Sequence, residues 1–260
     1  MDLGIEGKVA LVTGSSRGIG RGIALALAGE GCDLMLTGRD TAALDEAARS
    51  IRGKGRRAAV CVLDLRAEGA PAALIEAVRR ELGGLDILVN NAGTTRRGDF
   101  FALTDADWEE GYALKLFAHV RLARAAWPLL KERRGSLVAI GGTSGRKPEK
   151  EFTIGSSVNA AVAAFTKCLA DLGKADGVQV NCIHPSLVET ERQWRRIRAE
   201  VKRTGESESA VRERFCRELG LLRYGKVEDV ADLVAFMVSA HATWLHGATV
   251  DLDGGEIPVL

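Results

Sequence analysis

The feature that most constrains the fold is a regular alternation between short apolar segments and longer helical ones. The short segments are apolar along their whole length, which is typical of strands buried on both faces. The intervening segments, such as 21–29, 42–51 and 71–82, place Ala and Leu at helical spacing among charged residues. This alternation predicts a doubly wound (Rossmann-type) α/β fold, a parallel sheet with helices on both faces. The seven predicted strands are 8–13, 33–37, 58–64, 86–90, 136–140, 178–183 and 248–252.

The chain has 260 residues and no internal repeat, low-complexity segment or linker, so we expect residues 1–260 to form a single domain. Only the segment 189–221 breaks the alternation, because it is long, helical and densely charged. It follows the sixth predicted strand and therefore lies at the carboxyl edge of the sheet, where ligands bind. We expect this insertion to shape a substrate pocket. The alternative is a pair of solvated helices.

Composition narrows the classes of partner. A formal net charge of +1, without a basic stripe, gives no reason to expect nucleic acid. No apolar run approaches the ~18–20 residues that span a bilayer, so no membrane partner is expected. The five cysteines are scattered and never spaced as CxxC, which predicts reduced thiols and no metal site. The first apolar run resembles a strand instead of a signal peptide, so a cytoplasmic protein is expected.

A glycine-rich turn follows the first predicted strand and opens the first helix. It reads Thr13-Gly14-Ser15-Ser16-Arg17-Gly18-Ile19-Gly20. Glycines permit a tight turn, and the free N–H groups of a helix N-terminus bind a pyrophosphate. The sequence therefore predicts a dinucleotide site here, with the contacts Gly14, Ser16, Arg17, Gly18, Ile19 and Gly20.

Further motifs recur at matching places: Asp64 after the third strand, NNAG at 90–93, the segment 185–190, and Asp253-Gly254-Gly255. With these motifs the chain resembles the short-chain dehydrogenase/reductase family over about residues 5–255. The resemblance implies a nicotinamide cofactor, a small carbonyl or alcohol substrate, and a homo-oligomer, either a tetramer or a dimer. It also implies further cofactor contacts: Asp64, Leu65, Asn91, Ala92 and Gly93 on the adenosine side, and Pro185, Val188 and Thr190 at the nicotinamide.

Cofactor choice is predicted from charge at the tip of the second strand. An acidic residue there binds the ribose hydroxyls of NAD and repels a 2′-phosphate. This chain has Thr37-Gly38-Arg39, and Arg17 lies in the glycine-rich turn. Two guanidinium groups can bind a phosphate, so NADP(H) is expected and NAD(H) is less favoured. The alternative is that both arginines are merely solvated.

The usual reaction centre of the family is missing. Its members use a Tyr as proton donor, a Lys four residues later, a Ser and an Asn. The only tyrosines, Tyr112 and Tyr224, are followed four residues later by Leu116 and Glu228, so no Tyr-x-x-x-Lys exists. The flanking sequence indicates that all four positions hold other residues. Gly142 stands at the position of the Ser and Gly155 at that of the Tyr. Asn159 stands at the position of the Lys and Lys115 at that of the Asn.

The two glycines are expected to leave open volume beside the nicotinamide. The predicted substrate pocket consists of Gly142, Thr143, Gly155, Asn159 and Arg192. Two residues are candidates for the missing chemistry. A buried Lys115 would have a depressed pKa and could act as acid, base or Schiff-base nucleophile. His184 would act if it faced the pocket, although a single His at a strand end is also typical of a structural role.

The cations expected to border the pocket suggest a negatively charged ligand; they are Arg96, Arg97, Lys115, Arg146, Lys147 and Arg192. The alternative is that Glu109, Glu110, Glu149 and Glu151 neutralise them. The function predicted from these features is NADP(H)-dependent oxidoreduction of a small, anionic carbonyl or alcohol with a non-standard proton donor. Two alternatives remain open: a non-redox lyase, aldolase or hydratase with a structural cofactor, and a catalytically inactive cofactor-binding or sensor protein.

Overall fold

The computed structural model describes residues 2–258 and contains a seven-stranded sheet in the order β3-β2-β1-β4-β5-β6-β7. Every neighbouring pair of strands is parallel. The predicted doubly wound α/β architecture is therefore confirmed. The strands are β1 (Val9–Thr13), β2 (Asp33–Gly38), β3 (Ala58–Val62), β4 (Ile87–Asn90), β5 (Ser136–Ile140), β6 (Gln179–Pro185) and β7 (Thr249–Leu252).

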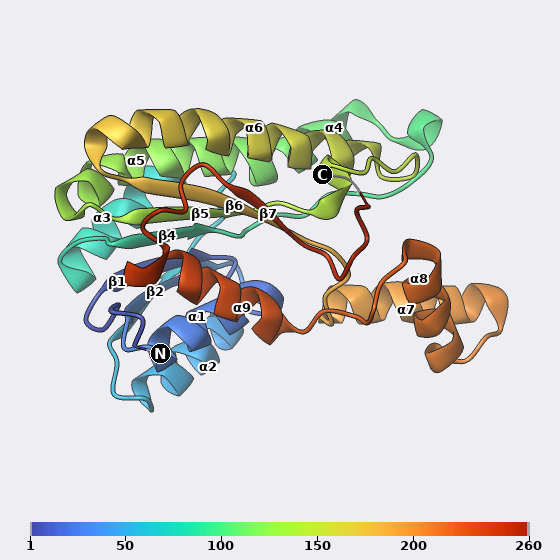
Figure 1. Cartoon of the computed structure of the whole chain (residues 1–260), viewed down its shortest axis with the longest axis horizontal. Coiled ribbons are helices and arrows are strands. Elements are labelled where there is room, and N and C mark those ends of the chain that lie inside the picture. Colours follow the sequence, from blue (N-terminus) through green and yellow to red (C-terminus); the bar gives the residue numbers. More distant parts are fainter. Residues whose placement is uncertain (1, 259–260) are drawn as a thin grey trace.

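Helices cover both faces of the sheet (Figure 1). On one face α1 (Gly18–Gly29), α2 (Thr41–Arg52) and α9 (Val227–Met237) bury Ile23, Leu44 and Val230 against the strands. The other face is covered by α3 (Ala70–Leu82), α5 (Ala118–Arg133) and α6 (Thr153–Asp176). Two separate apolar clusters thus sandwich the sheet, which explains why the strands are apolar along their whole length.

Several strand ends differ from the prediction by one residue, and two differ by two residues for reasons of pairing. The third strand ends at Val62, because β3 is an edge strand whose pairing with β2 stops at Gly38 and Val62. The sixth continues to Pro185, because β7 pairs with it as far as Leu252. Proline fits this strand end, where its missing N–H is not needed.

A π-helical turn joins α4 (Asp105–Tyr112) to α5. It spans Ala113–Phe117 and places Lys115 at its centre. Turns of this kind widen a helix by one residue and occur often at functional sites. Here the turn packs against α6, and Lys115 reaches the carboxyl edge of the sheet at Gly141.

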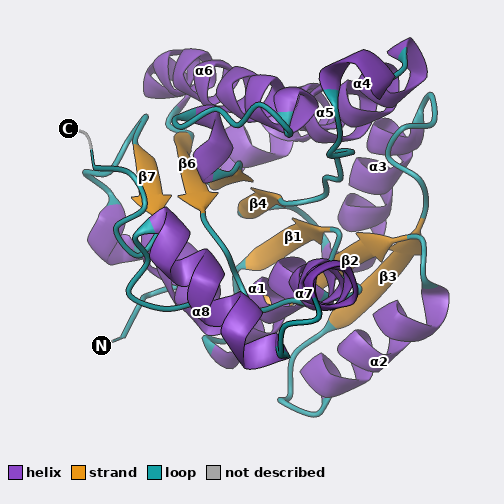
Figure 2. Ribbon diagram, turned by 90° about the vertical axis from the view of Figure 1, so that its right-hand side faces the viewer, coloured by secondary structure: helices purple, strands orange, loops and turns teal. Residues whose placement is uncertain are grey.

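The charged insertion forms α7 (Glu191–Thr204) and α8 (Glu208–Leu219), which project beyond the carboxyl ends of the strands (Figures 1 and 2). A small cluster of Ile197, Val211, Phe215 and Tyr224 holds the two helices together. That residues 1–260 form one domain stays a prediction. In the part of the chain that the structure describes, no helix combines the length and apolar character that crossing a membrane requires.

Candidate active site at the carboxyl edge of the sheet

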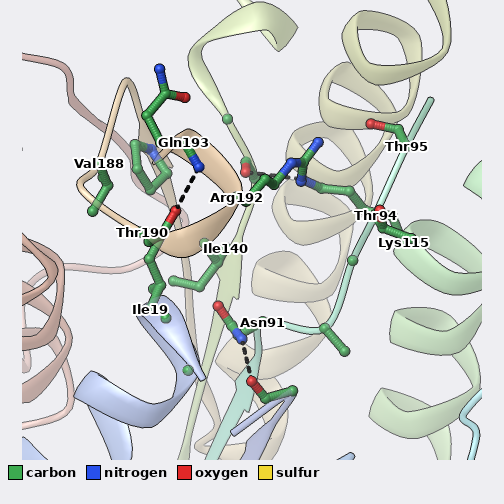
Figure 3. Close-up of a pocket in the computed structure, with 18 of the residues that line it drawn as sticks. Ile19, Asn91, Thr94, Thr95, Lys115, Ile140, Val188, Thr190, Arg192 and Gln193 are labelled. Carbon is green, nitrogen blue, oxygen red and sulfur yellow. Dashed lines mark hydrogen bonds between the residues drawn. The ribbon is translucent and has the colours of Figure 1, made fainter. Parts of the chain in front are cut away.

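A cavity of about 840 Å³ runs along the carboxyl edge, from the glycine-rich turn to α7 and α8. Figure 3 shows a close-up of this space. All predicted cofactor contacts line it: Gly14, Ser16, Arg17, Gly18, Ile19, Gly20, Arg39, Asp64, Leu65, Asn91, Ala92, Gly93, Pro185, Val188 and Thr190. Of the predicted substrate-pocket residues, Gly142, Thr143, Asn159 and Arg192 also line it, as does Lys115.

The glycine-rich turn has the geometry that a dinucleotide requires. Gly14 and Gly18 have φ angles of 66° and 56°, a region that glycine adopts without strain. A Cβ atom at Gly20 would lie 2.4 Å from both Asn91 Nδ2 and Gly14 O, so the backbone packs too closely for any side chain. Helix α1 begins at Gly18 with no acidic residue in its first turn. Backbone N–H groups that no side chain covers, at a helix N-terminus without a nearby carboxylate, are suited to bind a pyrophosphate.

The NNAG segment is fixed to this turn by Thr13. The Thr13 hydroxyl accepts hydrogen bonds from the backbone N–H groups of Asn91 and Ala92, both at 2.9 Å. The Asn91 side chain donates in return to the Thr13 carbonyl at 2.8 Å. These bonds join the ends of β1 and β4, where the strand order reverses. Ligands of doubly wound sheets bind at this point.

The tip of β2 carries positive charge. Arg39 and Arg17 line the cavity, and the Arg39 side chain is 63% exposed. Asp40 also lines it, but its carboxylate accepts the Ala43 N–H at 3.1 Å and so caps α2. Asp64 is engaged as well: Arg66 donates to it at 2.6 Å, and this bond is the largest cause of its lowered pKa. The arrangement fits a 2′-phosphate better than a pair of free ribose hydroxyls.

Two side chains occupy the volume that Gly142 and Gly155 leave beside the expected nicotinamide site. A Cβ at Gly155 would lie 2.1 Å from the Phe152 ring, and a Cβ at Gly142 would lie 2.8 Å from Asn159 Nδ2. The residues Phe152 and Asn159 therefore fill the space that the two glycines leave. Gly155 itself is not among the described residues that line the cavity, which corrects its place in the predicted substrate pocket.

Asn159 is held with one polar atom unused. Its Nδ2 donates to the Ser144 hydroxyl at 2.9 Å, and its Oδ1 has no hydrogen-bond partner among residues 2–258. The side chain is only 3% exposed and lines the cavity. A buried acceptor without a partner is costly, so this amide is suited to receive a hydrogen bond from a ligand.

Lys115 enters the cavity from the π-helical turn (Figure 3). Its Nζ donates to the Gly141 carbonyl at 3.1 Å, just beyond the carboxyl end of β5. Its aliphatic part packs so closely on Gly93 that a Cβ there would lie 3.0 Å from Lys115 Cδ. Burial, and secondly the charge of Arg192, lower the pKa of Lys115 to about 8. An amine with this pKa exchanges protons readily near neutral pH.

His184 lies elsewhere, contrary to the expectation that it could face the pocket. Its side chain is fully buried, and it is not among the described residues that line the cavity. The ring packs against Gly141, where a Cβ would lie 2.5 Å from His184 Cδ2. Its Nδ1 is 3.5 Å from Asp251 Oδ1. Burial lowers the pKa of His184 to about 4, so the ring is neutral and shielded from substrate.

Most of the predicted pocket cations have partners. Arg96 pairs with Asp107 at 2.8 Å, Arg97 with Glu149 at 2.7 Å, and Arg146 with Asp251 at 3.5 Å. Lys147 reaches the Glu256 carbonyl at 3.4 Å. Of the predicted neutralising residues, Glu149 acts as expected, whereas Glu110 pairs with Arg66 at 2.6 Å.

Phe152 and Arg196 are among the cavity residues that the sequence analysis did not identify. Phe152 comes from the loop before α6, and its ring lies 4.3 Å from the Arg97 guanidinium carbon. Arg196 lies one helical turn after Arg192 on α7, and both line the cavity. The spacing of four residues was the available signal for Arg196, because it places both side chains on one helix face.

Comparisons with known proteins agree with this geometry. The sequence model of the family described as short chain dehydrogenase matches residues 8–201. The chain is 30% identical to 2,3-dihydro-2,3-dihydroxybenzoate dehydrogenase of Bacillus subtilis, with 97% of each chain covered. It is 32% identical to the 3-oxoacyl-acyl-carrier-protein reductase FabG of Pseudomonas aeruginosa, over 97% of this chain and 98% of the relative. Among solved structures, L-sorbose reductase from Gluconobacter frateurii, complexed with NADPH and L-sorbose, superimposes with a TM-score of 0.96 at 34% identity, covering 100% of both chains.

Proposed function

The chain belongs to the short-chain dehydrogenase family, and we propose that it is an NADP(H)-dependent oxidoreductase in which Lys115 serves as the proton donor. Its substrate is a small carbonyl compound or the corresponding alcohol. The four residues on which the family relies are replaced by Lys115, Gly142, Gly155 and Asn159, so the proton must come from a different group. Lys115 is the group whose position and acidity suit that task.

The choice of NADP(H) rests on the charges at the tip of β2. Arg17 and Arg39 line the cavity there, and Asp40 is engaged in capping α2. Gly14, Gly18 and Gly20 would hold the pyrophosphate on bare backbone, and Thr190, Val188 and Pro185 would lie at the nicotinamide end. The structural relative from Gluconobacter frateurii is described as complexed with NADPH, which supports the same choice.

The observation that carries the proposal is the position of Lys115 Nζ. It lies in the cavity, 3.1 Å from the Gly141 carbonyl, on a turn that opens toward the site. The Gly141 carbonyl accepts one hydrogen bond and leaves the other ammonium protons for a ligand. Burial keeps the pKa near 8, so the ammonium form predominates at neutral pH yet releases a proton easily.

NADPH, when bound, supplies a hydride to the carbonyl carbon. Lys115 then donates a proton to the carbonyl oxygen, so that a C=O group becomes CH–OH. Asn159 Oδ1 accepts a hydrogen bond from a hydroxyl of the substrate, which orients it in the cavity. In the oxidative direction the neutral amine of Lys115 accepts the hydroxyl proton.

The test is a panel of small ketones, aldehydes and oxo acids, each mixed with the protein and NADPH. Both the NADPH absorbance and the concentration of the carbonyl compound are followed. Equal loss of both supports oxidoreduction. Loss of the carbonyl compound at constant NADPH absorbance contradicts it and indicates non-redox chemistry. Binding of NADPH without any turnover across the panel indicates a sensor or partner subunit.

A second candidate function is favoured by Arg192, whose charge lowers the pKa of Lys115. A lysine beside another cation is suited to attack a carbonyl carbon as a neutral amine, forming an imine and releasing water. Such lyase or aldolase chemistry would leave the cofactor structural. Borohydride reduction of the incubated mixture would then add the carbon skeleton to Lys115, and mass spectrometry would detect the added mass.

We also propose that the chain forms a homo-oligomer. Large apolar side chains are exposed at the end of the π-helical turn, on α6 and before β7: Phe117 at 48%, Leu172 at 62% and Trp244 at 99%. Exposed apolar side chains of this size are typical of surfaces that another subunit covers. Sedimentation of the purified protein measures the oligomeric state, and a monomer at micromolar concentration would contradict the proposal. A cytoplasmic location stays a prediction.

A further inference from the structure

The part of the cavity beside α7 holds more positive charge than the protein neutralises. Arg97, Lys115, Arg192 and Arg196 all line it. Arg97 is paired with Glu149 at 2.7 Å. Within residues 2–258, Lys115, Arg192 and Arg196 have no carboxylate at ion-pair distance. Three cations therefore face one space without a counter-charge from the described chain.

The carboxylates that line this part of the cavity are already engaged. Glu149 binds Arg97, Glu191 binds Arg198 at 2.9 Å, and Glu218 binds Arg214 at 3.5 Å. The Glu256 carboxylate accepts a hydrogen bond from the Ser186 hydroxyl. A rearrangement that neutralised Arg192 or Arg196 with one of these groups would break an existing contact.

The cations are close enough to act on one another. Arg192 and Arg196 lie one turn apart on the same face of α7. The pKa of each is lowered chiefly by burial and secondly by the charge of Arg97. Figure 3 shows Arg192, from α7, and Lys115, from the opposite wall, directed into the same space. Arg192 is exposed and Arg196 is half-buried. Like charges that face one cavity repel, and a bound anion would relieve that repulsion.

Building on the oxidoreductase function above, we propose that Arg192 and Arg196 form an oxyanion-binding subsite and that the substrate carries a carboxylate or phosphate group beside its reacting carbonyl. The guanidinium group offers paired N–H donors that match the oxygens of either anion. The Arg196 guanidinium carbon also lies 4.8 Å from the Phe215 ring centroid, which limits its orientations. Arg192 and Arg196 thus determine specificity, and Lys115 remains free to act on the carbonyl.

The cofactor has phosphates of its own, but other residues are placed to bind them. These residues are those of the glycine-rich turn, with Arg17 and Arg39, and they line the same cavity. The test is therefore run with saturating NADPH, which satisfies those groups before any anion is added. Any further anion effect then belongs to the space beside α7.

The experiment measures the melting temperature of the NADPH-bound protein in malonate, in inorganic phosphate and in chloride at equal ionic strength. Malonate or phosphate should raise the melting temperature of the unsubstituted protein above its value in chloride by about 2–4 °C. Arg192→Gln and Arg196→Gln should abolish this rise. Lys202→Gln is the matched control, because Lys202 is exposed on the same helix and has no ion-pair partner within residues 2–258, and it should retain the rise. A response to malonate alone identifies a carboxylate site, and a response to phosphate alone identifies a phosphate site.

A second readout needs no added ligand. Without malonate or phosphate, Arg192→Gln should melt at a higher temperature than the unsubstituted protein, because the substitution removes a repelling charge. The proposal is overturned if neither anion stabilises the protein more than chloride does, or if the rise persists in Arg192→Gln. It is also overturned if Arg192→Gln weakens NADPH binding tenfold, because Arg192 would then serve the cofactor. Neither the melting temperatures nor the NADPH affinity depend on turnover. The anion site is therefore tested even if the protein is not an oxidoreductase.

Discussion

The aromatic ring of Phe152 fills the space into which a side chain at Gly155 would project. A Cβ built on Gly155 lies 2.1 Å from Phe152 Cε1 and Cζ. A side chain three residues earlier in the sequence thus closes the space that any residue larger than glycine would need at position 155.

This packing predicts that Gly155→Ala destabilises the protein, although alanine favours helices. The added methyl group would force the Phe152 ring or the backbone of α6 to move, at a cost of about 1–3 kcal/mol in the free energy of unfolding. Urea denaturation measures the change. Gly29→Ala is the control, because nothing lies within 4 Å of a Cβ there, and it should not destabilise. Equal effects of the two substitutions would contradict the packing of Phe152.

Arg39 is predicted to contribute to the preference for NADPH over NADH. Arg39→Ala should weaken NADPH binding by about tenfold and leave NADH binding unchanged, because the guanidinium would contact the 2′-phosphate, which NADH lacks. A larger loss is not expected, since the Arg39 side chain is 63% exposed and solvent screens its charge. Fluorescence titration of both cofactors measures the affinities. Arg49→Ala, on the exposed face of α2, should change neither, and an unchanged NADPH affinity in Arg39→Ala would argue against the 2′-phosphate site.

Arg212 is predicted to hold α7 in place. Its guanidinium carbon lies 4.8 Å from the Trp194 ring centroid and 5.1 Å from that of Tyr224, and it forms an ion pair with Glu189. Arg212→Ala should remove these contacts and lower the melting temperature by about 2–4 °C. The malonate or phosphate response should also weaken, because Arg192 and Arg196 lie on α7. Arg217→Ala on α8, where the side chain is exposed, should preserve both properties, and full anion response in Arg212→Ala would show that α7 needs no such support.

The sequence predicted the fold and the cofactor end of the cavity well, because both depend on local signals. Apolar runs bounded by helical segments define parallel strands, and the contacts around Gly14 and Gly18 come from one contiguous turn. Errors there were limited to strand ends such as Val62, where pairing with a neighbour decides the boundary.

The reaction end was predicted less well, because its geometry depends on contacts between distant segments. Nothing local indicates that Phe152 turns back over Gly155. The sequence left open whether His184 faces the pocket or has a structural role, because β6 is buried on both sides and its alternation does not reveal which side is the cavity. Lys115 lines the cavity, and its catalytic role stays a prediction.

A change of charge near pH 8 can be assigned to Lys115, because the ionisable groups around it have pKa values far from 8. Burial lowers the pKa values of His119 and His184 to about 4 and raises that of Cys182 to about 12. The pKa of Arg192 is lowered, but from an ordinary value of 12.5. None of these four groups is expected to change charge near pH 8, where Lys115 does.

The most direct test of Lys115 as the proton donor is the pH dependence of kcat for the best carbonyl substrate of the panel. Because the ammonium form is the donor, kcat for reduction should be constant below about pH 8 and fall above it, while kcat for alcohol oxidation should rise. Lys115→Met should lower kcat by about 10²–10⁴-fold and abolish the pH dependence, with NADPH affinity retained. Lys174→Met, on the exposed surface of α6, should behave like the unsubstituted protein. A Lys115→Met protein that keeps its turnover and its decline above pH 8 would contradict the account.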